Sequence, residues 1–229
     1  MQDLKLFFAH VGKTGGTSLR HAAYQHFGRA RCVCLYGEGR SGNTGGAFEA
    51  FSAALGRGAT REAAAEAVID LARRERAAFL STHELDLFAP RFPAEKTATL
   101  VRDPVERTLS LYNFWRRLGR ELPPFEAFIE EPRFRNVQAR ALRNLDLDAI
   151  AAVGVTERYA ESVALFNRRF GVALPALRRN RTWRLPWRAS KARVGAAVAR
   201  RIEQLNAEDM ALHARALRRL DSDLVALEA

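Results

Sequence analysis

The feature that most constrains the fold is a short apolar segment that runs directly into a glycine-rich turn. Residues Leu4 to Val11 are mostly apolar and aromatic, and the turn Gly12 to Gly16 follows without a break. An apolar run of this length, bounded by glycines, is typical of a buried strand. Thr17 is then a candidate N-cap for a helix that reaches about Phe27, with Gly28 as its stop. This order of elements predicts the start of an α/β layered fold.

Strands and helices continue to alternate along the chain. We expect further strands at residues 77–82, 96–101 and 151–155, and helices at residues 60–76, 105–118, 157–170, 189–205 and 207–220. Thr60 and Thr156 are candidate caps for two of these helices. Such alternation favours a central, mostly parallel sheet flanked by helices on both faces. Because no internal repeat or clear boundary interrupts the pattern, we expect a single domain over residues 1–229.

The glycine-rich turn has the composition of a phosphate-binding site. Glycines let the backbone turn tightly with its N–H groups pointing inward, and the N-terminus of the following helix favours an anion. Lys13 adds a full positive charge, and hydroxyl donors come from Thr14, Thr17 and Ser18. The signature of nucleoside triphosphate-binding loops has a glycine five residues before Gly12, where this chain has Phe7. The turn therefore predicts a phosphate site of a different kind.

A second candidate phosphate site follows the strand at residues 96–101. Arg102 leaves the carboxyl end of that strand, where ligands bind in open α/β sheets. Ser110 comes eight residues later, about two turns along the next helix. A guanidinium binds a phosphate in a bidentate manner, and a serine hydroxyl can complete the contact. Alone, Arg102 and the Asp-Pro pair after it are equally compatible with a capped helix and a solvated arginine.

Both segments resemble the phosphate-binding motifs of the carbohydrate sulfotransferases, particularly the branch related to heparan sulfate 2-O-sulfotransferase. The first motif matches at residues 13–18, and the second matches at Arg102, Asp103, Pro104, Arg107, Ser110 and Tyr112. Residues 136–138 and 154–158 also look like family segments. Gly12 departs from the family, which usually has proline there. The resemblance covers about two-thirds of the chain, unevenly.

The resemblance implies a P-loop-like sulfotransferase fold and a defined donor. It implies transfer of a sulfonate group from 3′-phosphoadenosine 5′-phosphosulfate (PAPS) to a hydroxyl group, with a glycan or glycolipid as the expected acceptor. Lys13 is expected to be catalytic as well, because its charge would stabilise the 5′-phosphate as the sulfonate departs. No metal is expected, because lysine and backbone N–H groups already hold this leaving group. The residues expected to bind the donor are Lys13, Thr14, Gly15, Gly16, Thr17, Ser18, Arg102 and Ser110.

The acceptor hydroxyl must lose a proton, and His83 is the base that the resemblance suggests. It follows the strand at residues 77–82, and histidine titrates near neutrality. The alternative is an ordinary hydrogen-bonded histidine in a turn. Glu84 and His10 are rival bases, although His10 precedes the glycine turn and is expected to be structural. Contacts with the acceptor are suggested by resemblance alone for Asn136 and Gln138.

Two further segments allow two interpretations each. The glycine-rich loop at residues 37–46 is either a disordered connection or a lid or acceptor-binding loop. A basic, aromatic segment near residue 183 either stacks on an adenine or binds an anionic acceptor, or it is a solvated basic loop whose tryptophans pack against the protein. Its notable residues are Arg179, Arg181, Trp183, Arg184, Trp187 and Arg188.

The charge of the chain indicates anionic partners without choosing among them. Lysine and arginine number 37 against 26 acidic residues, which gives a net charge of +11. A general bias toward alanine and arginine could supply much of that charge. Two other functions therefore stay open: a small-molecule or nucleotide kinase of the same broad fold, and a non-catalytic basic module for acidic glycan or nucleic acid. For a sulfotransferase we expect no nucleic-acid partner.

The remaining sequence features concern location. No run of eighteen or more apolar residues is present, and the N-terminal residues lack the apolar core and cleavage site of a signal peptide. Cys32 and Cys34 are one residue apart, a spacing that rarely forms a disulfide and does not match zinc or redox motifs. We therefore expect reduced thiols, no transmembrane segment, and a cytoplasmic chain or the soluble catalytic domain of a longer protein.

Overall fold

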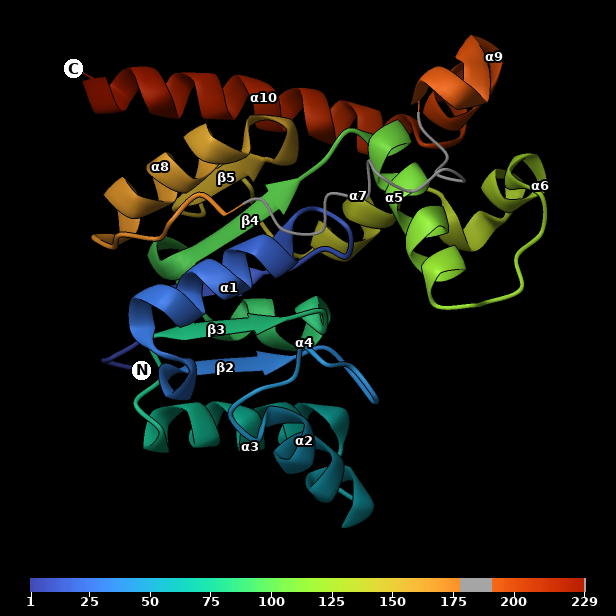
Figure 1. The fold of residues 1–229 in the computed structure, drawn as a ribbon. Helices are drawn as coiled ribbons and strands as arrows, with labels where there is room; N and C mark the ends of the chain where they lie inside the picture. Colours follow the sequence, from blue (N-terminus) through green and yellow to red (C-terminus); the bar gives the residue numbers. More distant parts are fainter. Residues whose placement is uncertain (178–190, 229) are drawn as a thin grey trace.

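A five-stranded parallel sheet forms the centre of the protein (Figure 1). The computed structural model describes residues 1–177 and 191–228. The strands are β1 (Leu6–Ala9), β2 (Cys32–Leu35), β3 (Phe79–Thr82), β4 (Thr97–Val101) and β5 (Ala152–Val155). Their order in the sheet is β2-β3-β1-β4-β5, and every neighbouring pair is parallel. The expected α/β class with a parallel sheet is confirmed.

Helices surround this sheet. They are α1 (Gly16–Phe27), α2 (Ala47–Gly56), α3 (Arg61–Arg74), α4 (Leu85–Phe88), α5 (Pro104–Arg117), α6 (Phe125–Glu130), α7 (Val137–Leu142), α8 (Tyr159–Phe170), α9 (Lys191–Leu205) and α10 (Ala207–Glu228). Figure 1 shows α1 across one face of the sheet, α2 and α3 beside the β2 edge, and α8 and α10 beside the β5 edge. None of the described helices is long and apolar enough to cross a lipid bilayer.

Strand β2 and helix α2 were not predicted from the sequence. The four residues of β2 are all apolar and show no alternation, and they form a strand because they pair with β3, with Cys32 opposite Phe79. Helix α2 begins after Gly46, whose backbone is left-handed (φ 69°) and which provides no side-chain cap. The usual sequence signal for a helix start is therefore missing there. Both cysteines of β2 carry free, buried thiols.

The expected helix boundaries are partly right. Thr60 caps α3 by accepting a hydrogen bond from Ala63 N (3.2 Å), and Gly28 ends α1. Thr17, however, lies inside α1, which begins one residue earlier, after the left-handed Gly15. Thr156 does not cap a helix directly, because α8 follows a 3₁₀ turn, η5 (Thr156–Arg158).

Buried aromatic and aliphatic side chains fix the strands in place. Every residue of the five strands is buried, as expected for a parallel sheet covered on both faces. Phe7 of β1, where a nucleoside triphosphate-binding loop would have glycine, is fully buried and stacks on Phe92 at 4.1 Å between ring centroids. A second apolar cluster joins α5, α6 and α9 through Val105, Phe128 and Ile202. This packing fixes the edge of the sheet where all five strands end.

Candidate active site

A large pocket opens at the carboxyl edge of the sheet, and the segment after every strand contributes to it. Residues 10–13 follow β1, Tyr36 follows β2, His83 follows β3, Arg102 follows β4 and Thr156 follows β5. Ligands of open α/β sheets bind at this edge. The pocket has a volume of about 1320 Å³. Because typical small-ligand sites measure roughly 300–1,000 Å³, this one has room for two substrates.

The glycine-rich turn after β1 has an unusual backbone. Lys13 has φ 74° and Gly15 has φ 93°, so both lie in the left-handed region. That conformation costs a residue with a Cβ atom about 1–2 kcal/mol, and strain of this kind gathers at functional sites. Gly16 is required for another reason: a Cβ atom there would lie 2.0 Å from His10 Nε2. The imidazole of His10 therefore packs directly against the start of α1.

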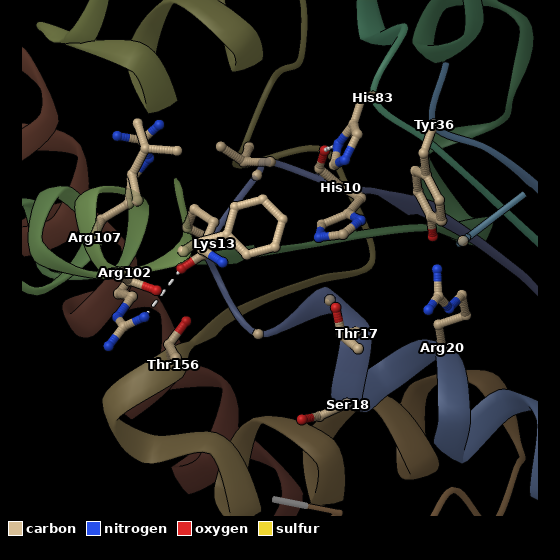
Figure 2. Close-up of a pocket in the computed structure, with 18 of the residues that line it drawn as sticks. His10, Lys13, Thr17, Ser18, Arg20, Tyr36, His83, Arg102, Arg107 and Thr156 are labelled. Carbon is tan, nitrogen blue, oxygen red and sulfur yellow. Dashed lines mark hydrogen bonds between the residues drawn. The ribbon is translucent and has the colours of Figure 1, made fainter. Parts of the chain in front are cut away.

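The three hydroxyls of the turn have different surroundings. Thr17 and Ser18 line the pocket, from the first turn of α1 (Figure 2). Thr14 is fully buried, and its hydroxyl donates to Val11 O at 2.8 Å. The side chain of Thr14 thus closes the turn and is not a pocket-lining donor. Thr156, which is not part of the turn, connects the turn to the end of β4, since its hydroxyl lies 2.7 Å from Thr14 O and 3.1 Å from Val101 O.

Lys13 carries its charge in a crowded, basic environment. Its Nζ atom lies 4.0 Å from the centre of the Phe114 ring. Burial and, after it, the charges of Arg117, Arg102 and Arg107 together lower the pKa of Lys13 to about 8. No carboxylate of the described residues forms an ion pair with Lys13. An anion in the turn would offset this concentration of positive charge.

The second predicted segment meets the first in this pocket. The guanidinium of Arg102 donates from Nη1 to Lys13 O at 3.2 Å, the contact drawn as a dashed line in Figure 2. Two carboxylates flank the same guanidinium, Glu106 at 3.5 Å and Glu157 at 3.8 Å. Ser110, on α5, lines the pocket as well. The two predicted segments are therefore neighbours in one pocket.

The backbone of Arg102 is held by an amide from α7. Gln138 Oε1 accepts from Arg102 N, and Gln138 Nε2 donates to Arg102 O, both at 2.8 Å. The Gln138 side chain is fully buried by these contacts and does not line the pocket, so the suggested acceptor contact is wrong for this residue. Asn136 does not line the pocket either, and its side-chain amide donates a hydrogen bond to Glu208 at 2.9 Å. Neither side chain therefore lines the pocket: that of Gln138 fixes the backbone of Arg102, and that of Asn136 binds α10.

Arg107 is a pocket residue to which the sequence assigned no role. It stands in the matched Arg-Asp-Pro motif, which was the available signal, but the expected donor ligands did not include it. Only 4% of its surface is exposed, and its Nε atom has no hydrogen-bond partner among the described residues. Burial lowers its pKa to about 10, against the opposing charge of Asp209. A buried cationic donor without a partner, at the wall of a pocket, is a candidate anion ligand.

His83 lies beside His10 at the other end of the pocket. Its Nδ1 atom is 2.7 Å from His10 O, and the two rings are 4.4 Å apart. A carbonyl oxygen only accepts, so Nδ1 carries the proton and Nε2 keeps its lone pair. Although His83 is exposed to the open pocket, desolvation lowers its pKa, and Arg40 and Arg20 add to this, while the hydrogen bond to His10 opposes it. His83 is therefore neutral at pH 7 and able to accept a proton.

The rival bases are placed differently. Glu84 forms an ion pair with Arg61 and does not line the pocket. His10 does line the pocket, but it is only 7% exposed, and burial holds its pKa well below the usual range. Its carbonyl orients His83, and its ring packs against Gly16. These contacts give His10 the structural role expected from the sequence, within the site itself.

The glycine-rich loop at residues 37–46 forms one wall of the pocket. The side chain of Asn43 fixes the start of the loop, because its Oδ1 atom accepts from Tyr36 N and its Nδ2 atom donates to Gly37 O, each at 2.7 Å. Arg40, Ser41 and Gly42 line the pocket beside His83. These contacts favour the acceptor-loop interpretation over a disordered connection. The tryptophans and arginines at residues 179–188 lie outside the described residues.

The strand order, the glycine-rich turn after β1 and the pocket at the strand ends define an α/β protein with the P-loop-like fold of sulfotransferases. A solved structure described as a sulfotransferase from Alicyclobacillus acidocaldarius superposes with a TM-score of 0.55. The superposition covers 94% of this chain and 96% of that chain, with 17% sequence identity. No family model matches the chain, and no curated protein matches it. At this level of identity the likeness establishes the shared fold.

Proposed function

We propose that this protein is a sulfotransferase that moves a sulfonate group from PAPS to a hydroxyl group of a carbohydrate acceptor. The observation that carries the proposal is the contact between Arg102 Nη1 and Lys13 O, 3.2 Å apart, within one pocket. Because the two candidate anion-binding segments are neighbours in one pocket, this contact supports binding of a single nucleotide with phosphates at both ends of its ribose. The shared fold with a bacterial sulfotransferase supports the same assignment.

The residues of the pocket fit such a donor. The backbone N–H groups at the start of α1, Lys13 and the hydroxyls of Thr17 and Ser18 would bind the 5′-phosphosulfate. Arg102 and Ser110 would bind the 3′-phosphate, and the unpartnered Nε of Arg107 offers a further donor. Thr14 contributes through the backbone, because its hydroxyl already closes the turn.

The chemistry would be an in-line displacement at sulfur. His83 Nε2 takes the proton of the acceptor hydroxyl, and the acceptor oxygen forms a new bond to sulfur. The bond between sulfur and the oxygen of the 5′-phosphate breaks, so that 3′-phosphoadenosine 5′-phosphate (PAP) leaves with that electron pair. Lys13 stabilises the negative charge that grows on the 5′-phosphate. His83 Nδ1 keeps its proton and goes on donating it to His10 O, which keeps the imidazole oriented throughout.

The donor site is tested by calorimetric titration of PAP into wild-type protein, Lys13→Ala and Arg102→Ala. We expect each variant to bind PAP roughly tenfold more weakly or worse, because each loses a charge-assisted contact. Lys5→Ala is the matched control, since Lys5 is exposed on the chain just before β1 and lies outside the pocket. Wild-type affinity in both variants would contradict the donor assignment.

The base is tested by transfer assays against a panel of glycans with PAPS as the donor. His83→Ala should keep wild-type PAP affinity and lose about 10²- to 10⁴-fold in turnover, the usual contribution of a general base. Glu84→Gln is the control, because Glu84 follows directly in the chain but pairs with Arg61 outside the pocket. A His83→Ala variant with nearly intact turnover would show that another group takes the proton.

The same titrations separate the two alternative functions. A kinase would lose nucleotide binding in a chelator of divalent cations, whereas the proposed site binds PAP through protein groups and should bind it equally well with EDTA. A non-catalytic basic module would show steeply salt-dependent binding of polyanions and no saturable site for PAP.

A further inference from the structure

The end of the pocket near His83 has a charge of its own. It is formed by Arg20 of α1, Tyr36, the glycine-rich loop at residues 40–42 and His83, and we call it the acceptor end. The two carboxylates that line the pocket, Glu106 and Glu157, both lie beside Arg102, at the end that also holds Lys13 and that we call the donor end. Within the part of the chain that the structure describes, the acceptor end is therefore lined by cations without an acidic partner.

Arg20 is the central cation of this end. Its Nε atom is buried and has no hydrogen-bond partner among the described residues, and no described carboxylate forms an ion pair with it. Figure 2 shows its guanidinium pointing from α1 toward Tyr36. A buried guanidinium nitrogen without an acceptor is costly, and in native structures such a group usually meets a ligand or an ordered water.

The surrounding residues hold Arg20 in place. Its guanidinium carbon lies 5.5 Å from the centre of the Tyr36 ring, and the Tyr36 hydroxyl is fixed by a 2.8 Å hydrogen bond to Ser81. On the loop side, a Cβ atom on Gly42 would lie 1.9 Å from Arg20 Nη1. The loop thus passes directly over the guanidinium. The Tyr36 ring is also 4.7 Å from His83, so it links Arg20 to the candidate base.

We propose that the acceptor carries an oxyanion, either a carboxylate or a sulfate ester, near the hydroxyl that is sulfated, and that Arg20 binds this oxyanion. The inference rests on the proposed function, because it assigns the acceptor to the end of the pocket that holds His83. A planar guanidinium binds either oxyanion in a bidentate manner. Arg40, exposed on the loop, adds positive charge at the rim.

The bound oxyanion also affects the base. Arg20 and Arg40 both contribute to the lowered pKa of His83. A negative charge between them would oppose that effect and raise the pKa of His83, which makes it a stronger proton acceptor when the acceptor is in place. A neutral acceptor would leave His83 a weaker base.

The first experiment measures oxyanion binding with inorganic sulfate as the probe. Sulfate is titrated into protein saturated with PAP, so that the donor end is occupied, using wild type, Arg20→Gln and Arg29→Gln. Arg29 is the matched control, because it is exposed, stacks on the same Tyr24 ring as Arg20, and lies outside the pocket. We expect Arg20→Gln to weaken sulfate binding roughly tenfold or more, and Arg29→Gln to leave it unchanged.

The second experiment measures acceptor preference with a matched pair of probes. In the carboxyl-reduced form of a hyaluronan oligosaccharide each carboxylate is replaced by a neutral CH2OH group, and each of the two forms is titrated into the same three PAP-saturated proteins and assayed for transfer to the hydroxyls that both share. Wild type should prefer the charged form roughly tenfold or more, and Arg20→Gln should lose that preference. Equal sulfate binding by Arg20→Gln and Arg29→Gln, or no sulfate binding by PAP-saturated wild type, would overturn the inference while leaving the proposed function intact. Failure of PAP to bind wild type would overturn both.

Discussion

Lys13 combines features that are each unusual for a lysine. It has a left-handed backbone, its amine lies over the Phe114 ring, and three arginines surround it closely enough to lower its pKa. The left-handed backbone and the repulsion among the cations both cost free energy without a ligand, and only the contact with Phe114 is favourable. An anion in the turn would offset the repulsion among the four cations, which is the physical reason to place the reacting phosphosulfate there.

The lowered pKa of Lys13 predicts how nucleotide affinity depends on pH. Lys13 is protonated below about pH 8 in the free protein and loses its charge above that value, so PAP affinity should fall as pH rises from 7 to 9.5. The phosphates of PAP have a second pKa of about 6, so they are largely ionised at pH 7, and their further ionisation would act against this fall in affinity. Calorimetry on wild type and Lys13→Arg checks the prediction, because arginine keeps its charge throughout.

We expect the wild-type affinity to fall roughly tenfold over this range, and the Lys13→Arg affinity to stay nearly constant even if it starts lower. Parallel pH profiles for the two proteins would mean that Lys13 does not carry the interaction.

At the scale of elements, the turn after β1 is held by the corner between β5 and α8. The Thr156 hydroxyl lies within hydrogen-bond distance of Thr14 O in the turn and of Val101 O at the end of β4. Nearby, Asp103 N donates to Glu157 at 3.2 Å. Three strand ends are thereby fixed relative to one another, so that the turn and Arg102 keep their spacing.

Thr156→Val should weaken both the fold and the site. The change removes the hydroxyl at nearly constant volume, so the one proton that Thr156 shares between Thr14 O and Val101 O is lost, which should lower the free energy of unfolding by about 1–3 kcal/mol. PAP affinity should fall as well, because the turn is no longer tied to β4. Thr156→Ser keeps the hydroxyl and should behave like wild type in chemical denaturation and in PAP titration. Equal PAP affinity for Thr156→Val and Thr156→Ser would show that the turn keeps its shape without this tether.

At the scale of the whole molecule, the C-terminal helix supports the donor end of the pocket from outside it. Asp209 of α10 accepts hydrogen bonds from Ala139 N at 2.8 Å and Gln138 N at 3.2 Å. Gln138 in turn holds the backbone of Arg102, and the charge of Asp209 favours the protonated form of buried Arg107. A residue of α10 therefore positions two arginines that come from the strand–helix unit around β4.

Asp209→Asn should reduce PAP affinity without a contact to the nucleotide. The variant loses the charge that compensates Arg107 and places an N–H group against backbone donors, so we expect a loss of about 1–3 kcal/mol in the free energy of unfolding. Glu208→Gln is the control, because Glu208 is the exposed neighbour and makes one exposed hydrogen bond, to Asn136. PAP affinity is compared at a temperature where all proteins are folded, so that a loss reports on the site. Unchanged affinity in folded Asp209→Asn would contradict this positioning role.

Much of this organisation was predictable from the sequence because its signals are local. The glycines after β1, the Arg-Asp-Pro segment after β4 and the eight-residue interval to Ser110 each concern residues close in the chain. A local pattern of this kind predicts a strand end, a turn or a helix start. The rule that parallel strands end at one edge then brings Lys13, His83 and Arg102 together.

The tertiary structure alone decided which side chains serve the pocket and which support it. The Thr156–Thr14 contact joins residues 142 positions apart, and the contact that sets the His83 tautomer joins residues 73 positions apart. No local pattern distinguishes Gln138, buried behind Arg102, from a residue that touches an acceptor, or marks Arg20 and Arg107 among the many arginines of this chain. Strand β2 likewise forms only because β3 lies beside it. The physical reason is that burial and unpaired polar atoms are properties of distant segments packed together, whereas composition and spacing describe each segment alone.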